Sequence, residues 1–281
     1  MAALFDIVPG EAPEPIHLSA GEPSEARAAQ CDAHGPYIAR DLMRGPHRNP
    51  VWSRCPTCMQ EKEAEQRAQE EQKAAHQHAE QRRWLLSQCG AVGRFGEASF
   101  DSFQATTTEQ QRVRAACRTF ASDLEPDSGA GLILIGPPGT GKTLLLNAIV
   151  RHVAGERGMR SLVITARDLV RRVRATWRHR SWEPDVWGNR PETEEGVIEQ
   201  LGSTTHLLAL DEVGASFGTE AEQTLLLDVI DMRYRLRRPT VVASNLALPA
   251  MRNAIGERSF DRLRDGAKVL LCTWPSHRGQ A

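Results

Sequence analysis

One short pattern constrains the fold of this chain more than any other feature. Residues 136–143 read GPPGTGKT, which matches G-x-x-x-x-G-K-[ST], and they lie between the apolar run GLILI and an apolar-periodic stretch. Glycines at such a turn let backbone N–H groups curl around phosphate oxygens, and the N-terminus of the following helix adds positive potential. The sequence therefore predicts a strand, a phosphate-binding loop and a helix in this order, an arrangement typical of α/β folds.

Each part of this loop has an expected role toward a nucleoside triphosphate. Lys142 should reach the β and γ phosphates, and the Thr143 hydroxyl should ligate magnesium. No NKxD motif for reading guanine occurs in the chain, so we expect the nucleotide to be ATP. The expected contacts are Gly136, Pro137, Pro138, Gly139, Thr140, Gly141, Lys142, Thr143 and Leu144.

Beyond residue 90 the chain alternates apolar runs with helix-compatible stretches. A chain of 281 residues, 40% of them hydrophobic, can bury one core domain with a smaller segment beside it. We expect five strands in a parallel sheet with covering helices, so the fold class is α/β. The expected strands are residues 132–135, 162–165, 206–210, 240–244 and 268–272.

Acidic and amide side chains end two of these strands. The segment HLLALDEVG ends its strand in Asp211 and Glu212, at the carboxyl end where nucleotide sites of open α/β sheets lie. We expect Asp211 to orient the magnesium ion and Glu212 to act as general base on the attacking water. Asn245 follows the strand in PTVVASNLAL and could hold that water or sense the γ phosphate. The alternative for Asn245 is a turn residue that only ends the strand.

The N-terminal part holds two pairs of metal-ligand residues. Cys31 and His34 form one pair at x2 spacing, and Cys55 and Cys58 form the other, so four N and S donors can surround a structural zinc ion. A segment this short, with little apolar sequence, could scarcely fold without metal. His47 is an alternative ligand, and redox chemistry at the CxxC pair is the other interpretation.

The predicted organisation has four segments. A Pro- and Glu-rich tail comes first, and a charged stretch without Gly or Pro from Met59 onward predicts one helix. That helix is either a solvated linker or a coiled-coil or partner-binding helix. The expected boundaries are 1–28 for the flexible tail, 29–58 for the zinc module, 59–90 for the linker helix and 91–281 for the α/β domain.

Two arginine-rich segments suggest contacts with other molecules. Arg258, Arg262 and Arg264 have helical spacing, and one of them could reach the γ phosphate of a neighbouring subunit, which implies self-association. A second segment could neutralise DNA phosphates and stack on an exposed base without sequence preference. Its members are Arg167, Arg171, Arg172, Arg174, Trp177, Arg178 and Arg180. The alternative for both segments is a solvated helix face, and the net charge of -1 shows that acidic stretches balance the arginines.

Four segments together resemble a known family. GPPGTGKT, LLALDEVG, LLLDVIDMRYRLRRPTVVASNL and GERSFDRLRDG resemble the AAA+ P-loop NTPases of the DnaC helicase-loader type, with the IstB transposition ATPases close behind. The resemblance covers about residues 94–275, where RFGEASFDSF looks like the segment that leads into the adenine pocket. It implies an AAA+ ATPase domain, sensing by Asn245 and a trans-acting finger at Arg262, with Arg258 and Arg233 as competitors. Too few residues follow Arg262 for a C-terminal lid, and the loaders also look lidless.

The resemblance implies an ATP-dependent loader of a DnaB-type replicative helicase onto single-stranded DNA, with ATP, Mg²⁺ and Zn²⁺ as cofactors. The zinc module and the linker helix would bind the helicase. The alternative is an IstB-like ATPase that binds duplex DNA and recruits a transposase, and a third interpretation is a zinc-bearing adaptor with ATP as a static ligand. No apolar run is long enough to span a membrane, and the acidic, Pro-rich N-terminus is unlike a signal peptide. We therefore expect a cytoplasmic protein without a membrane partner.

Overall fold

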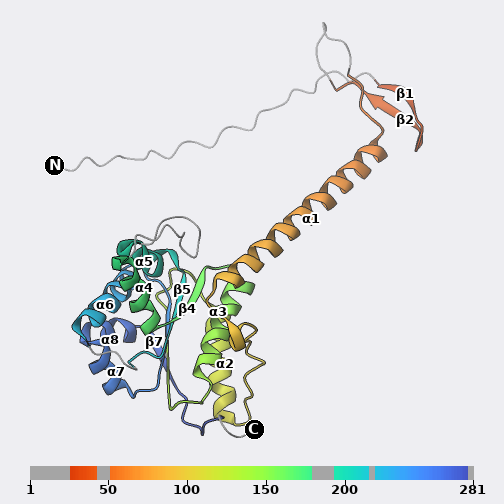
Figure 1. Ribbon diagram of the computed structural model, residues 1–281. Helices are drawn as coiled ribbons and strands as arrows, with labels where there is room; N and C mark the ends of the chain where they lie inside the picture. Colours follow the sequence, from red (N-terminus) through yellow and green to blue (C-terminus); the bar gives the residue numbers. More distant parts are fainter. Residues whose placement is uncertain (1–25, 43–50, 179–192, 215–218, 278–281) are drawn as a thin grey trace, which may run out of the picture. The chain divides into compact units, whose positions relative to one another are not determined.

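The computed structural model describes residues 26–42, 51–178, 193–214 and 219–277 (Figure 1). The chain divides into two compact units, Met1–Ala75 and His76–Ala281. The four-segment division expected from the sequence stays a prediction. Among the helices of the described ranges, none combines the length and the apolar character that crossing a bilayer requires.

A small antiparallel hairpin organises the N-terminal unit. Its strands are β1 (Ala26–Cys31) and β2 (Gly35–Arg40). Gly35 has φ +80, a left-handed conformation that closes the turn and that glycine adopts without steric cost. The Arg27 guanidinium lies 4.3 Å from the centre of the Trp52 ring, which ties the hairpin to the chain that returns beside it. The sequence did not predict this hairpin.

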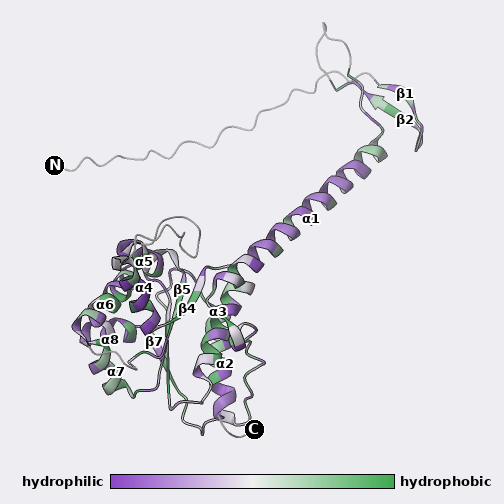
Figure 2. Ribbon diagram, in the orientation of Figure 1, coloured by the Kyte–Doolittle hydropathy of each residue, from purple (hydrophilic) through white to green (hydrophobic). Residues whose placement is uncertain are grey.

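The charged stretch forms one long helix, as expected. α1 (Pro56–Gln88) begins at Pro56 rather than at Met59, because proline fits the first turn of a helix, where its missing N–H has no partner to lose. Most of its residues are hydrophilic (Figure 2), and Leu85 is its one buried residue. The end of α1 that carries Leu85 packs in the core of the second unit.

The second unit is built on a five-stranded sheet of order β4-β5-β6-β3-β7, in which every pairing is parallel. All five predicted strands are confirmed, and no strand end differs from its predicted position by more than one residue. Their bounds are β3 (Gly131–Ile135), β4 (Ser161–Thr165), β5 (Leu207–Asp211), β6 (Thr240–Ser244) and β7 (Ala267–Leu271).

Helices cover both faces of this sheet. Leu132 and Leu134 of β3 join the apolar core on one face, and Ile133 and Ile135 join the core on the other, which is the alternation of a strand buried on both sides. The first face is covered by the end of α1, α2 (Thr108–Ser122) and α3 (Lys142–Glu156). The second face is covered by α4 (Ala166–Arg178), α5 (Glu194–Glu199), the π-helical turn η2 (Gln200–Thr204), α6 (Glu220–Arg235), α7 (Leu248–Ile255) and α8 (Glu257–Arg264). A short 3₁₀ turn, η1 (Gly93–Phe95), precedes α2.

The strand order decides where the site forms. β6 lies between β3 and β5, so the three strands that carry the sequence motifs are neighbours. Because they are parallel, their carboxyl ends meet at one edge of the sheet. The phosphate-binding loop, the acidic pair and Asn245 are therefore brought together by topology alone.

Candidate nucleotide-binding site and metal centre

The phosphate-binding loop joins β3 to α3, as predicted. Gly139 has φ +84 and Gly141 has φ +88, so both occupy the left-handed region that glycine tolerates. A Cβ atom on Gly136 would lie 2.2 Å from the carbonyl oxygen of Cys272, so the loop begins where two backbones approach closely. Only glycine fits at each of these three positions without strain or collision, so the three glycines are what allow the sequence to form this loop.

Lys142 is held inside the loop. Its side chain is buried, with 6% of its surface exposed, and Nζ donates to the carbonyl oxygens of Gly136 at 2.7 Å and Pro137 at 2.8 Å. The Thr140 hydroxyl also donates to the Pro137 carbonyl at 3.0 Å. The ammonium group is thus fixed at the N-terminus of α3, where a phosphate oxygen would meet both the lysine and the first N–H groups of the helix.

The acidic pair ends β5 at the same edge of the sheet. Asp211 is buried, and its Oδ1 accepts a hydrogen bond from the backbone N–H of Glu212 at 2.8 Å. Glu212 is exposed and has φ +54, a conformation that costs a non-glycine residue about 1 to 3 kcal/mol. Strain of this kind persists where the surroundings impose it. Here the carboxylate of Asp211 holds the backbone of Glu212 turned out of the strand.

The last residue of β6 and the residue that follows it are both polar. The buried Ser244 hydroxyl donates to the carbonyl of Val213 at 2.6 Å and accepts from the N–H of Leu246 at 3.0 Å, so it ties the ends of β5 and β6 together. Asn245 is exposed. The sequence placed both residues at this strand end but did not foresee that Ser244 joins the two strands.

These residues line one cavity of about 230 Å³. Besides the acidic pair and Asn245, its walls include Pro138, Gly139, Gly141, Lys142, Thr143 and Leu144 of the loop. Ala243 and Ser244 of β6 also line it, together with Arg94, Phe95 and His277. Arg94 and Phe95 belong to the segment expected to lead into the adenine pocket, and the Arg94 guanidinium lies 4.6 Å from the Phe95 ring centre. The sequence offered no motif that could have found His277.

The two favoured candidates for the trans-acting arginine finger, Arg262 and Arg258, lie away from this cavity, on α8. Arg262 Nη2 is 2.6 Å from Asp231 Oδ1, and the residue lines a separate cavity of about 470 Å³. Gly131 and Thr240, the first residues of β3 and β6, line the same cavity, so it lies at the opposite end of the strands from the phosphate loop. Arg258 is exposed in the first turn of α8. Neither residue lines the phosphate cavity of its own chain.

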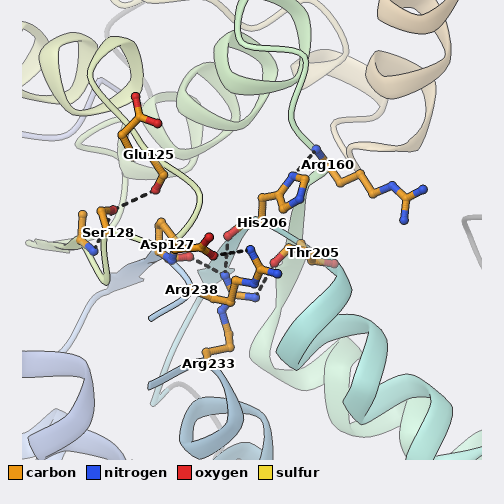
Figure 3. Close-up of polar contacts among 10 residues, drawn as sticks. Glu125, Asp127, Ser128, Arg160, Thr205, His206, Arg233 and Arg238 are labelled. Atoms are coloured by element: carbon orange, nitrogen blue, oxygen red, sulfur yellow. Dashed lines mark hydrogen bonds and ion pairs between the residues drawn. The ribbon is translucent and has the colours of Figure 1, made fainter. Parts of the chain in front are cut away.

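The prediction that Arg233 competes with these residues as the trans-acting arginine finger is wrong. Only 1% of its surface is exposed, and its guanidinium points into the backbone around Thr205 and His206 (Figure 3). Its donors are directed at four carbonyls, those of Leu201, Thr205, His206 and Pro239, and at the hydroxyl of Thr240. Burial lowers the pKa of Arg233 to about 9, and the nearby Arg238 adds repulsion. A side chain committed to the interior in this way cannot reach a neighbouring subunit.

The expected DNA-contacting segment forms α4, and its described side chains already have partners. Arg171 pairs with Asp168 at 3.3 Å, and the side chain is 75% exposed. The Trp177 indole N–H donates to Glu194 Oε2 at 2.6 Å while the residue stays 57% exposed. Arg172 donates to Gln200 Oε1 at 2.6 Å, and Arg174 pairs with Glu222 at 3.4 Å. The side chain of Arg178 and all of Arg180 lie outside the described residues, as do Glu183, Asp185 and Glu192 of the acidic stretch that follows.

The four predicted metal ligands do converge. Their ligand atoms, from Cys31, His34, Cys55 and Cys58, all lie within 4.8 Å of one another. Cys31 Sγ and Cys58 Sγ are 3.4 Å apart, near the separation of about 3.8 Å that tetrahedral Zn–S bonds of about 2.3 Å give. The N–H groups of His34 and Ala33 lower the pKa of Cys31 to about 6, which favours a thiolate there, whereas the hydrogen bond to Cys31 raises the pKa of Cys58 to about 11. The residues fit a structural zinc site, whereas the alternative ligand His47 lies outside the described residues.

A carboxylate lies behind the histidine ligand. His34 Nδ1 faces Cys58 Sγ at 3.2 Å, so this nitrogen is the one turned toward the metal position. Its other nitrogen, Nε2, is 3.0 Å from Oε1 of Glu61 in the first turns of α1. An acceptor at Nε2 places the ring proton there and leaves Nδ1 free to bind metal. Glu61 was not foreseen from the sequence.

A parallel sheet with a P-loop, an acidic strand end and a neighbouring polar strand end defines a class, the nucleotide-binding AAA+ proteins. Residues 68–278 match the family model of the IstB-like ATP binding protein. The chain therefore belongs to the IstB-like ATP-binding family, and the expected membership of the DnaC and IstB group is confirmed.

Curated relatives and solved structures agree. The replicative helicase loader DnaC of Buchnera aphidicola subsp. Schizaphis graminum is 29% identical over 195 residues, 69% of this chain and 74% of the relative. The DnaC loader of Escherichia coli strain K12 is 28% identical over 183 residues, 65% and 69% of the two chains. A crystal structure of the DnaC helicase loader superimposes with TM-score 0.55 at 21% identity, over 64% of this chain and 99% of that one. A DnaI structure gives 0.52 at 22%, over 65% and 91%. At these identities the structures show the AAA+ fold alone.

Proposed function

We propose that this chain is an ATP-driven loader that places a DnaB-type replicative helicase on single-stranded DNA in the cytoplasm. Likeness to the DnaC loaders across the ATP-binding unit supports the choice of partner. The position of Glu212 is the observation that supports an enzyme rather than an adaptor that binds ATP as a static ligand. Its strained backbone turns an exposed carboxylate toward the cavity that Lys142 and Asp211 also line.

The roles follow from where the residues stand. Lys142 and the N–H groups of the loop would bind the β and γ phosphates. Thr143 and Asp211 would hold magnesium, which when bound neutralises charge that develops on the phosphates. Glu212 would accept a proton from the attacking water, and Asn245 would orient that water or sense the γ phosphate.

Self-association would complete the site. Arg262 is too far along the strands to serve its own chain, because it lines a cavity at their opposite ends. We propose that it acts on the nucleotide of a neighbouring subunit, with Arg258 as the other candidate. For this to happen, the Arg262 guanidinium must leave its ion pair with Asp231 and contact a phosphate oxygen instead.

The N-terminal unit and α4 would hold the macromolecular partners. Zinc bound by the Cys/His cluster would fix the β1–β2 hairpin to the start of α1, and this module with the helix would bind the helicase. Single-stranded DNA would contact Arg171, Arg172, Arg174, Trp177 and Arg178 on α4.

Hydrolysis is tested by Glu212→Gln. ATP turnover in the presence of single-stranded DNA should fall by about 100-fold or more, because general bases contribute about that much. ATP binding should remain, since the amide keeps the size of the side chain. Glu220→Gln is a matched control, because Glu220 is an exposed residue at the start of α6 that does not line the cavity. Unchanged turnover in Glu212→Gln would remove Glu212 from the mechanism.

The division of labour is tested by removing residues 1–75, which leaves Leu85 and its packing intact. The shortened protein should bind ATP but should no longer retain the replicative helicase in a pull-down from its own host. Helicase retained at the level of the full chain would refute the role given to the N-terminal unit.

The family match also favours a second candidate, an IstB-like ATPase that assembles on duplex DNA and recruits a transposase. The two candidates differ in DNA preference. Tighter ATP-dependent binding to a long duplex than to a single strand of the same length, with a transposase in the pull-down, would favour the IstB-like function over the loader.

A further inference from the structure

The last described residues of the chain lie along the phosphate-binding loop. We call residues 272–277 the C-terminal strap. Cys272 N–H donates to the carbonyl of Ile135 at 2.6 Å, and further on His277 N–H donates to the carbonyl of Gly139 at 3.0 Å. Between them the Trp274 indole donates to the carbonyl of Thr140 at 3.0 Å. The strap therefore follows the loop from its beginning to its middle.

Buried aromatic rings fix the strap in place. Trp274 is 5% exposed and meets Phe103 edge-on, with ring centres 6.2 Å apart. Phe103 in turn lies against the loop, because a Cβ on Gly141 would be 2.5 Å from its ring. On the strap side, a Cβ on Gly139 would be 1.8 Å from the Ser276 hydroxyl. Two loop glycines are thus covered by these side chains, and the strap cannot shift without moving the loop.

Gln110 sets the protonation pattern of the His277 ring. Gln110 is buried, and its Oε1 accepts from Thr106 N–H at 2.8 Å, Thr106 hydroxyl at 3.0 Å and Thr107 N–H at 2.9 Å. These donors fix the oxygen, so the amide nitrogen is the atom that faces His277 Nε2 at 3.1 Å. Because an amide nitrogen only donates, His277 Nε2 must accept. The proton of the neutral ring therefore sits on Nδ1.

We propose that His277 is a nucleotide ligand, whose Nδ1–H donates to a phosphate oxygen of bound ATP. The ring is exposed to solvent and lines the same cavity of about 230 Å³ as Lys142 and Thr143, so a ligand in the loop comes within its reach. The inference rests on the proposed function of this cavity. It assigns to the strap a phosphate contact from the chain's own C-terminal segment.

The test measures dissociation constants of the full-length protein for ATP and ADP by isothermal titration calorimetry. His277→Ala removes the donor and should weaken binding of ATP about tenfold, the effect of one hydrogen bond to a charged acceptor. His277→Asn places an amide N–H near the position of Nδ1 and should restore affinity to within about threefold of the unchanged protein.

Thr273→Ala is the matched control. The Thr273 hydroxyl donates to Glu109 Oε1 at 2.8 Å, and Thr273 does not line the cavity. This variant therefore loses a contact of the strap without changing the cavity wall. Three results overturn the proposal: unchanged affinity in His277→Ala, no rescue by Asn, or an equal loss in Thr273→Ala. Failure of the unchanged protein to bind ATP would instead refute the proposed function of the cavity, and the two failures are distinguishable.

Discussion

Replacing Arg233 by Met should destabilise the second unit more than any exposed arginine replacement on the same helix. The side chain has five N–H donors, and all five are directed at acceptors in the interior. These acceptors come from η2, from the segment that leads into β5, and from the start of β6. Arg233 thus aligns the amino ends of the two strands whose carboxyl ends carry Asp211 and Asn245. Methionine fills most of the volume but satisfies none of the acceptors.

The magnitude follows from the carbonyls of Leu201, Thr205 and His206, which lose the donor that Arg233 supplies. The Pro239 carbonyl keeps a hydrogen bond from the Leu208 N–H at 3.3 Å. A buried polar group left without a partner costs about 1 to 3 kcal/mol, so three give about 3 kcal/mol at the lower end. Removing a desolvated cation returns part of this cost. We expect a net loss of about 2 kcal/mol, which lowers Tm by roughly 4 to 8 °C in a unit of this size. Arg233→Lys should not rescue it, because an ammonium has three donors and lacks the planar fork.

Thermal unfolding followed by circular dichroism measures this effect. Arg235→Met is the control, because Arg235 lies on the same helix, is 67% exposed and pairs with Asp231 at 3.0 Å. An exposed pair of this kind contributes roughly 0 to 1 kcal/mol. The reasoning fails if Arg233→Met and Arg235→Met unfold at the same temperature, since the buried carbonyls would then find other partners without cost.

Three further predictions concern the zinc module, the loop and the DNA surface. Glu61→Gln should weaken zinc retention against a chelator about 10- to 100-fold, while Glu63→Gln on the same helix should not. Gly139→Ala should abolish ATP binding measured by calorimetry, because its Cβ would collide with the strap. Gly158→Ala, which is equally left-handed but meets no atom within 4 Å, should lose only a little stability. Trp177→Ala should lower affinity for single-stranded oligonucleotides about 5- to 100-fold in fluorescence anisotropy, and an unchanged affinity would exclude base stacking there.

The phosphate site could be predicted because its determinants are local. A glycine-rich turn between an apolar strand and a helix carries its own geometry, and the apolar runs of β3, β5 and β6 specify buried strands regardless of context. Once the sheet is parallel and β6 lies between β3 and β5, Asp211 and Asn245 must stand beside the loop. The Cys/His cluster was predictable for a similar reason, since the x2 spacing repeats in its two pairs.

Features that depend on distant partners could not be predicted. Arg233 looks like any basic residue in a charged helix end, and only the carbonyls that converge from η2 and the strand starts make it a buried structural residue. His277 carries no motif, and its place in the cavity depends on Trp274 packing against Phe103. The β1–β2 hairpin lacks an apolar alternation, and Cys31 and His34 of the Cys/His cluster lie at its turn.

Arg262 and the phosphate-binding loop lie at opposite edges of the sheet, and this limits how copies of the chain can assemble. Arg262 lies at the amino ends of the strands and the phosphate loop at their carboxyl ends. If Arg262 of one copy is to reach the nucleotide of another, two different surfaces must meet. A two-fold dimer joins them only if both lie on one self-complementary face, so that each copy gives one arginine and receives one. If they lie on different faces, the assembly is head-to-tail, either a closed ring or an open helical filament. The stoichiometry of the ATP-bound protein in solution therefore separates the two arrangements, because a reciprocal dimer stops at two copies and a head-to-tail assembly does not.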